Sequence, residues 1–257
     1  MSEQAVAGAS ARRRTLSGVA VVAAAMIIGL TYSLSATLIA LDLDERGLGD
    51  TAIGLNAAMQ AVGVLVTAPF LPRLVGRFGV HTLMLGAIVV SAPTLAAFPF
   101  MPSTAYWLPL RLLLGGASEV LFVLAQTWVS GLSSESNRGR NMAGYTAFLS
   151  LGLALGPTIL AVIGTLDATP YLVGAGLILV AALFLLIPGL LVPPFERPPS
   201  SGVWRVFRLA PIAILTTLLN SSLETAGLSF LPIYAINAGW GRSRRPCSSR
   251  RSCSAPS

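Results

Sequence analysis

The sequence predicts an all-α integral membrane protein. Of its 257 residues, 54% are hydrophobic and only 11% are charged, and the mean hydropathy is +0.76. A soluble domain carries about a quarter charged residues, so this chain has too few charges to cover a surface in contact with water. The charges are also clustered, since the long run 79–116 holds only one arginine and one histidine. Lipid around the apolar side chains would remove the need for a charged surface.

Seven apolar runs are each long enough to cross a hydrocarbon layer about 30 Å thick as a helix. Helix is the expected structure because a segment inside lipid must hydrogen-bond its own backbone. The first six runs form one unit, and the seventh begins a second one. The predicted helices cover residues 16–41, 53–74, 80–101, 105–129, 142–166, 170–192 and 210–236.

The arginines predict the orientation of these helices. If successive helices alternate in direction, ten arginines fall on one side and only Arg46 falls on the other. Positively charged connections face the cytoplasm. We therefore expect a multi-pass protein of the plasma or inner membrane with its N-terminus in the cytoplasm. The ten arginines are residues 12, 13, 14, 73, 77, 138, 140, 197, 205 and 208.

Composition divides the chain into five segments. Residues 1–15 are expected to form a cytoplasmic tail, 16–192 the six-helix unit, and 193–205 a cytoplasmic linker rich in proline. Such a linker is stiff and polar. Residues 206–238 hold the seventh helix, and 239–257 form a tail rich in Arg, Ser and Pro.

The tail is polar, although an eighth apolar membrane helix is expected at this place in the chain. Codons for Cys and most codons for Ser, taken one base earlier, encode large apolar residues. The segment 247–254 would then become an apolar run. We therefore expect residues from about 241 onward to be translated out of frame, and resequencing of the locus tests this. The alternative is a genuine basic tail.

Two ionisable side chains fall inside the predicted fourth helix, where a charge is costly unless it reaches a partner or water. An isolated carboxyl near the middle, Glu119, points to proton transfer. The alternative is a permanently neutral glutamic acid bonded to a neighbouring helix. Arg111 lies two turns before it, at about 80° around the helix. It either belongs to the same pathway or extends to the outer interface.

Two further carboxyl groups are candidates for the same pathway. Glu224 is an isolated carboxyl in the seventh helix. Asp42 continues a polar stripe with Thr31 and Ser35 on the first helix, which is a plausible cavity face. Serine and threonine also often bond their own helix, and this is the alternative.

The connection between the second and third helices contains Arg73, Arg77 and Gly79. Two arginines in a short connection are often only a topology anchor. The functional interpretation is a latch, because arginine can bind helix C-terminal carbonyls or a partner carboxylate and release them when helices rock.

The fifth helix contains Gly152 and Gly156, four residues apart, followed by Pro157. Small residues at this spacing let helices approach closely, and proline removes a backbone hydrogen bond. Packing alone is the alternative interpretation.

The six helices, the linker and the arginine-containing connection resemble the N-terminal half of a major facilitator superfamily transporter. The family signature in that connection is of the type Gly-x-x-x-Asp-Arg-x-Gly-Arg-Arg. Arg77 and Gly79 match its Arg and Gly, whereas Gly76 stands at the Asp position. The resemblance implies a six-helix half bundle built as a 3+3 repeat, followed by the start of the second half, so that the chain is truncated.

Two further patterns resemble signatures of the same family. Arg111 and Gly115 match an Arg-x-x-x-Gly pattern that is associated with proton coupling. The Gly-x-x-x-Gly-Pro pattern that ends at Pro157 is similar to the antiporter signature, although Leu160 and Ala161 replace its last two glycines. The resemblance therefore implies export.

The resemblance implies a secondary transporter that exports a small organic molecule in exchange for protons. In that family, substrate binds near mid-membrane between two halves. This chain would supply one half and one helix of the other. We expect it to be inactive until the missing C-terminal half or a second copy completes the cavity. A non-transporting membrane scaffold or binding subunit is the alternative.

Other classes of function fit the sequence poorly. An enzyme is disfavoured because no nucleophile–base or metal-ligand pattern is present, and no cofactor is expected. The net charge of +7 arises from arginines at helix ends and in the tail, so nucleic acid is not an expected partner. The expected partners are the lipid bilayer, a small-molecule substrate and protons.

Overall fold

The computed structural model describes residues 3–101, 103–164 and 168–193, together with ten separate positions between 211 and 234. Within the three continuous ranges the chain forms helices and no strands. Two short 3₁₀ turns, η1 (Phe98–Phe100) and η2 (Thr104–Tyr106), lie between α4 and α5. The α-helices are α1 (Glu3–Glu45), α2 (Asp50–Thr67), α3 (Leu71–Phe78), α4 (Val80–Ala97), α5 (Trp107–Leu132), α6 (Arg138–Ile163) and α7 (Thr169–Leu185).

Several of these helices are long and apolar enough to cross a membrane. Four are so by themselves: α1, α4, α5 and α6. The bent pair α2 and α3 together is long and apolar enough to be a fifth, and α7 is a shorter apolar helix of 17 residues. The first six predicted helices thus correspond to helical segments of the structure. The predicted seventh lies largely outside the described residues.

The second predicted helix is not continuous. The sequence predicts one helix over 53–74, but the structure ends α2 at Thr67 and begins α3 at Leu71, with a bend of 59° between them. Pro69 lies at this break. Proline has no backbone N–H and cannot continue the hydrogen bonding of α2, so the helix ends here.

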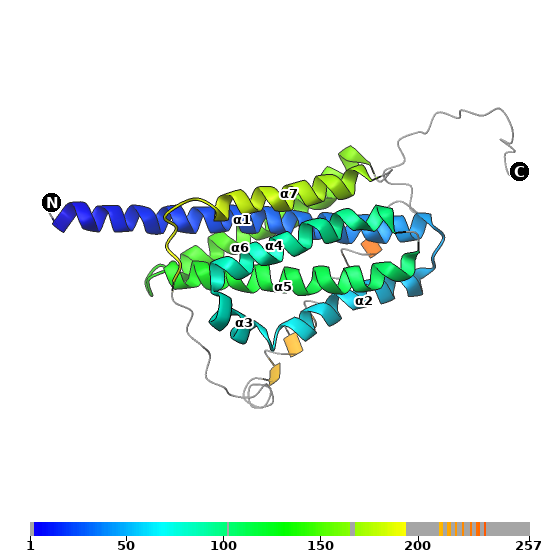
Figure 1. Cartoon of the computed structure of the whole chain (residues 1–257), viewed down its shortest axis with the longest axis horizontal. Helices are drawn as coiled ribbons and strands as arrows, with labels where there is room; N and C mark the ends of the chain where they lie inside the picture. Colours follow the sequence, from blue (N-terminus) through cyan, green and yellow to red (C-terminus); the bar gives the residue numbers. More distant parts are fainter. Residues whose placement is uncertain are drawn as a thin grey trace, which may run out of the picture.

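Two helix ends also differ from the prediction. Helix α7 ends at Leu185, whereas the sequence predicts a helix to residue 192. Pro188 and Gly189 follow, and Gly189 has φ +84°, a conformation that favours glycine. At the other end of the chain, α1 begins at Glu3, within the segment expected to be a tail. In Figure 1 its first turns project beyond the other helices.

The helices lie side by side as an elongated bundle, with α3 set off at one end (Figure 1). Two sets of three, α1–α2–α4 and α5–α6–α7, contact each other in a repeating pattern. Helix α1 packs most extensively on α6, and α5 packs most extensively on α2; α1 also packs on α7 as α5 packs on α4. Exchange of α1 with α5, α2 with α6 and α4 with α7 maps these contacts onto one another. This pattern is the one that a 3+3 repeat produces.

Glycines allow the two most extensive contacts. A Cβ at Gly152 on α6 would collide with the backbone oxygen of Met26 on α1. At the equivalent contact, a Cβ at Gly115 on α5 would collide with the backbone oxygen of Gln60 on α2, and one at Gly63 on α2 would lie 2.9 Å from the nitrogen of Gly116. Backbones therefore touch in both crossings, as small residues permit in membrane helix pairs.

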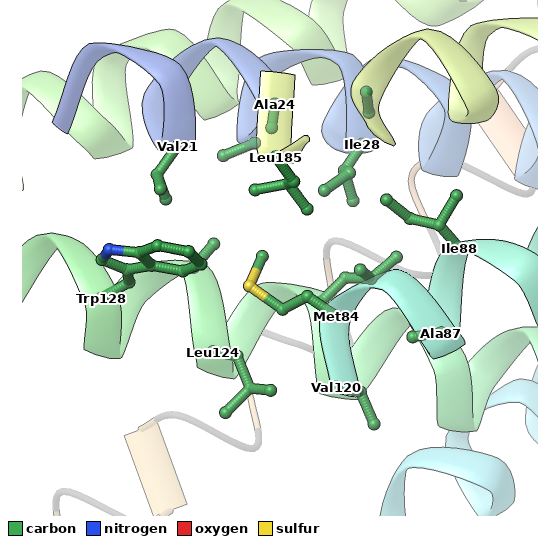
Figure 2. Close-up of a cluster of buried hydrophobic side chains, with 14 of the residues drawn as sticks. Val21, Ala24, Ile28, Met84, Ala87, Ile88, Val120, Leu124, Trp128 and Leu185 are labelled. Carbon is green, nitrogen blue, oxygen red and sulfur yellow. The ribbon is translucent and has the colours of Figure 1, made fainter. Parts of the chain in front are cut away.

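Apolar side chains fill the space between α1, α4, α5 and α7 (Figure 2). Because lipid chains are as apolar as leucine, this cluster is held mainly by van der Waals packing. It fixes α5 against three other helices, and α5 carries the two candidate residues of the sequence analysis. The labelled members are Val21, Ala24, Ile28, Met84, Ala87, Ile88, Val120, Leu124, Trp128 and Leu185.

Candidate functional site

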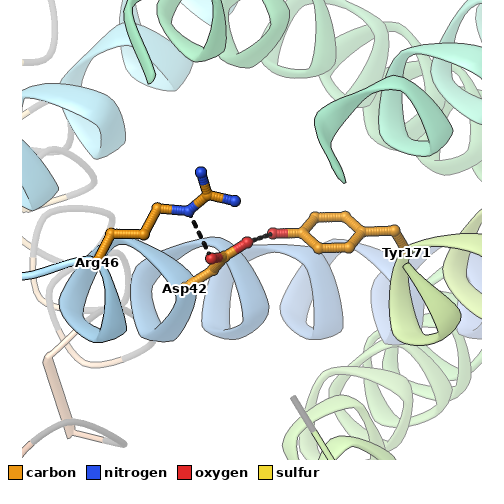
Figure 3. Close-up of polar contacts among 3 residues, drawn as sticks. All are labelled: Asp42, Arg46 and Tyr171. Atoms are coloured by element: carbon orange, nitrogen blue, oxygen red, sulfur yellow. Dashed lines mark hydrogen bonds and ion pairs between the residues drawn. The ribbon is translucent and has the colours of Figure 1, made fainter. Parts of the chain in front are cut away.

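A polar cluster joins α1 to α7 at the end of the bundle where α1 finishes, which we call the Asp42 end. The hydroxyl of Tyr171 donates a hydrogen bond of 2.7 Å to Asp42 Oδ2. Arg46 Nε donates one of 2.8 Å to the other carboxylate oxygen, so Asp42 is held from two sides (Figure 3). The hydrogen bond to Asp42 raises the pKa of Arg46, which therefore stays charged.

Aromatic rings surround this cluster. The guanidinium carbon of Arg46 lies 4.7 Å from the ring centroid of Trp107 at the start of α5, a cation–π contact. Trp107 meets Phe98 and Tyr171 edge-on, with centroids 5.2 and 6.5 Å away. Both Trp107 and Phe98 are fully buried. Arg46 therefore connects α1 to α5, while Asp42 connects α1 to α7.

Arg111 lies one turn further along α5 and is buried inside the bundle. Its side chain is 2% exposed, so it does not extend to the outer interface in this structure. Its Nε and Nη1 atoms have no hydrogen-bond partner among the described residues, and neither has Nε1 of Trp107. The guanidinium lies within electrostatic range of the hydroxyls of Tyr32 and Tyr171. Arg111 thus belongs to the same region as the Asp42 cluster.

Glu119 lies at the middle of α5 and is half-buried. It forms no ion pair with another described residue, and no hydrogen bond joins it to a neighbouring helix within the described ranges. Eight residues separate it from Arg111, a rise of about 12 Å along the helix. The structure therefore does not bring the two side chains together, and Glu119 stands apart from the Asp42 cluster.

Two of the three polar residues in the stripe on α1 hydrogen-bond to the backbone of their own helix. Thr31 donates a hydrogen bond to the carbonyl of Ile27 and Ser35 to the carbonyl of Tyr32, at 2.9 Å each. Both side chains are buried among helices. Asp42, in contrast, binds Arg46 four residues further on and Tyr171 on α7. Glu224 lies outside the described residues.

The motif glycines of the fifth predicted helix are contact residues. Gly152 and Gly156 on α6 both face the backbone of α1, and a Cβ at Gly156 would lie 2.6 Å from the nitrogen of Leu34. Pro157 stays inside α6 without ending it. Gly115, the glycine of the Arg-x-x-x-Gly pattern, has the same role against α2. These residues set helix spacing, whatever their further role.

The residues of the arginine-containing connection lie on α3 rather than in a plain turn. Arg73 and Arg77 are exposed, and Arg77 lies 5.4 Å from the ring centroid of Phe78. Gly79 has φ +80° and ends α3 directly before α4. Neither arginine forms an ion pair with a carboxylate among the described residues.

A second polar cluster lies at the opposite end of the bundle, and sequence reasoning missed it. Leu191, beyond α7, accepts a hydrogen bond of 2.8 Å from Trp128 Nε1 and donates one of 2.8 Å to Ser17 Oγ. His81 Nε2 lies 2.8 Å from the carbonyl of Leu185. The chain that leaves α7 is therefore fixed to α1, α4 and α5. We call this place the Ser17 end.

The described apolar helices, with Arg111 buried between them, define a multi-pass membrane protein. The sequence profile of the Major Facilitator Superfamily matches residues 21–249. The chain belongs to that family, and the predicted resemblance is confirmed.

Individual relatives agree with this assignment. The chain is 28% identical over 221 residues to YfkF of Bacillus subtilis, an uncharacterised MFS-type transporter; the match covers 83% of this chain and 56% of the relative. An uncharacterised MFS-type transporter of Enterobacter is 21% identical over 218 residues, with the same coverage. The multidrug resistance protein MdtG of Klebsiella pneumoniae is 29% identical over 133 residues, 51% of this chain and 32% of the relative. The chain thus spans about half the length of the first two.

Proposed function

We propose that this chain forms one wall of a proton-coupled secondary transporter that exports a small organic molecule. Glu119 is the observation that carries the proposal. A carboxyl at the middle of a membrane helix is costly when charged, and no described cation compensates it. Binding and release of a proton would change that cost. The protonation state of Glu119 would thereby be coupled to the groups that face it from the other wall of the cavity.

Proton coupling is supported by Arg111 and Gly115, which fit the pattern associated with it. Export is supported by one relative and by the Gly-x-x-x-Gly-Pro pattern of α6, which resembles the antiporter signature. The partial relative from Klebsiella pneumoniae is named a multidrug resistance protein. We propose the same direction of transport here.

The second wall of the substrate cavity would come from a C-terminal half or from another copy. Helix α6 supports this, because few of its residues are buried inside the structure, whereas most of those in α1 are. An apolar face of this extent fits contact with lipid or with such a wall. We expect no transport by these residues without it. The distribution of arginines leads us to place the Ser17 end on the cytoplasmic side of the plasma or inner membrane.

The test is substrate-driven proton movement in inverted membrane vesicles from cells that express the complete gene product containing this chain. Ethidium and benzenesulfonate serve as permanently charged probes of opposite sign. Addition of at least one should release protons from acidified vesicles. Vesicles that bind a probe but move neither the probe nor protons would favour a non-transporting membrane subunit and would contradict the proposal.

A further inference from the structure

Three hydrogen-bond donors on one turn of α5 are buried without an acceptor in the part of the chain that the structure describes. They are Nε and Nη1 of Arg111 and Nε1 of Trp107. The two residues are four apart, so they share one face of the helix with Cβ atoms about 6 Å apart. An unpaired buried donor is destabilising, and more so when it is charged. A group that accepts hydrogen bonds would remove this cost.

The charges around these donors do not balance. Arg46 and Arg111 both lie within electrostatic range of the Tyr171 hydroxyl, and Asp42 is paired with Arg46. Glu119 is about 12 Å further along α5. Counting the described residues alone, one positive charge is therefore left over in a buried place. The other acidic side chains near this end are exposed: Asp44, Glu45 and Asp50.

We propose that Arg111 and Trp107 bind the negatively charged head group of a small organic anion. Such an anion would be the substrate class of the proposed transporter. Only the description of the ligand as a substrate rests on that proposed function. A guanidinium offers several N–H groups in one plane and suits carboxylate or sulfonate oxygens, and the indole N–H adds a third donor. The rings of Phe98 and Tyr171 beside Trp107 would contact the apolar body of the ligand.

Arg46 lies between the Asp42 end of the bundle and the proposed anion site. Its guanidinium lies over the Trp107 ring at 4.7 Å, and Asp42 holds it there. Entry from the Asp42 end therefore requires Arg46 to move, as happens when helices rock between alternate arrangements. The donors are buried in the present arrangement and would become accessible in the other.

The test is ligand-induced thermal stabilisation of the purified full chain in detergent, which needs neither a membrane nor a proton gradient. Benzenesulfonate is the probe and neutral benzenesulfonamide its matched control. The sulfonate should raise the Tm of the unmodified chain, and the sulfonamide should not. Arg111→Met should weaken sulfonate binding about 10- to 100-fold, the effect of a lost charged hydrogen-bond donor. Arg140→Met, at an exposed arginine, should leave it unchanged.

A carboxylate of the chain itself is the competing source of the anion, and Glu224 is the variant that distinguishes it. If benzenesulfonate stabilises only the Glu224→Gln protein, the chain's own carboxylate occupies the site and the proposal is wrong. It is also wrong if the unmodified chain shows no shift, if the sulfonamide gives an equal shift, or if Arg111→Met binds with unchanged affinity.

Trp107→Phe keeps the charge and most of the ring, and it provides a second variant if Arg111→Met does not fold. Loss of one neutral donor should weaken sulfonate binding about two- to tenfold. Binding that depends on Arg111 and Trp107 without any proton movement in vesicles would retain the anion site and reject the transport proposal. Proton-coupled transport of ethidium alone, with no sulfonate binding, would support the transport proposal and contradict the anion site.

Discussion

The Tyr171 hydroxyl and the Asp42 carboxylate lie 2.7 Å apart, although 129 residues separate them in the sequence. The hydrogen bond joins α7 to the last turn of α1, and Arg46 holds the second oxygen of the same carboxylate. One set of three helices is thereby tied to the other at the Asp42 end. Hydrogen bonds of Trp128 and Ser17 with Leu191 do the same at the Ser17 end. A half bundle fixed at both ends would move as one body.

Tyr171→Phe should destabilise the bundle by about 1–2 kcal/mol, because it removes a hydrogen bond to a charged group that is partly exposed. The change is measured as the midpoint of thermal unfolding in detergent. Tyr106→Phe is the matched control, since that ring is 55% exposed. Equal midpoints for the two variants would mean that the Tyr171–Asp42 bond adds nothing to stability.

Gly152→Ala should destabilise the chain by about 1–3 kcal/mol, the usual cost of overpacking, because the added Cβ meets the backbone of Met26. Gly144→Ala lies on the same helix with no atom within 4 Å of its Cβ and should be neutral or slightly stabilising. Unfolding midpoints compare the two. A neutral Gly152→Ala would show that α1 and α6 are further apart than described.

Trp128→Phe should loosen the chain that leaves α7 while keeping a large ring in the core. The lost Nε1–Leu191 hydrogen bond is one of the bonds that fix this segment to the bundle. We expect faster limited proteolysis between residues 186 and 205, with the helices themselves still protected. Phe122→Leu, elsewhere on α5, is the comparison; an identical cleavage rate in the two variants would remove the anchoring role of Trp128.

The orientation that the arginines predict can be tested by labelling single cysteines in intact cells. Cys247 and Cys253 are first replaced with serine. Asp44→Cys and Arg140→Cys then place one thiol on each side, both at exposed positions. An impermeant maleimide should label position 44 only, and position 140 should react after lysis. Labelling of position 140 from outside would invert the proposed topology.

The helices were largely predictable because a membrane requires long apolar runs that form their own hydrogen bonds. Helix breaks were not. Pro93 and Pro157 stay inside α4 and α6, whereas Pro69 and Pro188 lie where helices end. All four occur in apolar surroundings, and neighbouring helices decide which prolines are tolerated. Composition along one segment does not contain that information.

The candidate site was predictable residue by residue but not as an arrangement. A charge within an apolar run identified Arg111 and Glu119, and helix geometry left a direct pair between them open. Tyr171, Trp107 and Arg46 were missed, since each has an ordinary position in the sequence. Only the packing of α7 and α5 around the end of α1 places Tyr171 and Trp107 in this cluster, whereas Arg46 follows Asp42 at i,i+4 spacing.

Replacement of Glu119 by glutamine tests the proposed proton coupling most directly. In inverted vesicles that contain the complete gene product, Glu119→Gln should abolish the proton movement that a transported probe causes, because a neutral amide cannot bind and release a proton. Exchange of labelled probe across the membrane without a gradient should persist. Glu135→Gln, at an exposed residue between α5 and α6, should behave like the unmodified protein. Unchanged proton movement in Glu119→Gln would contradict the account.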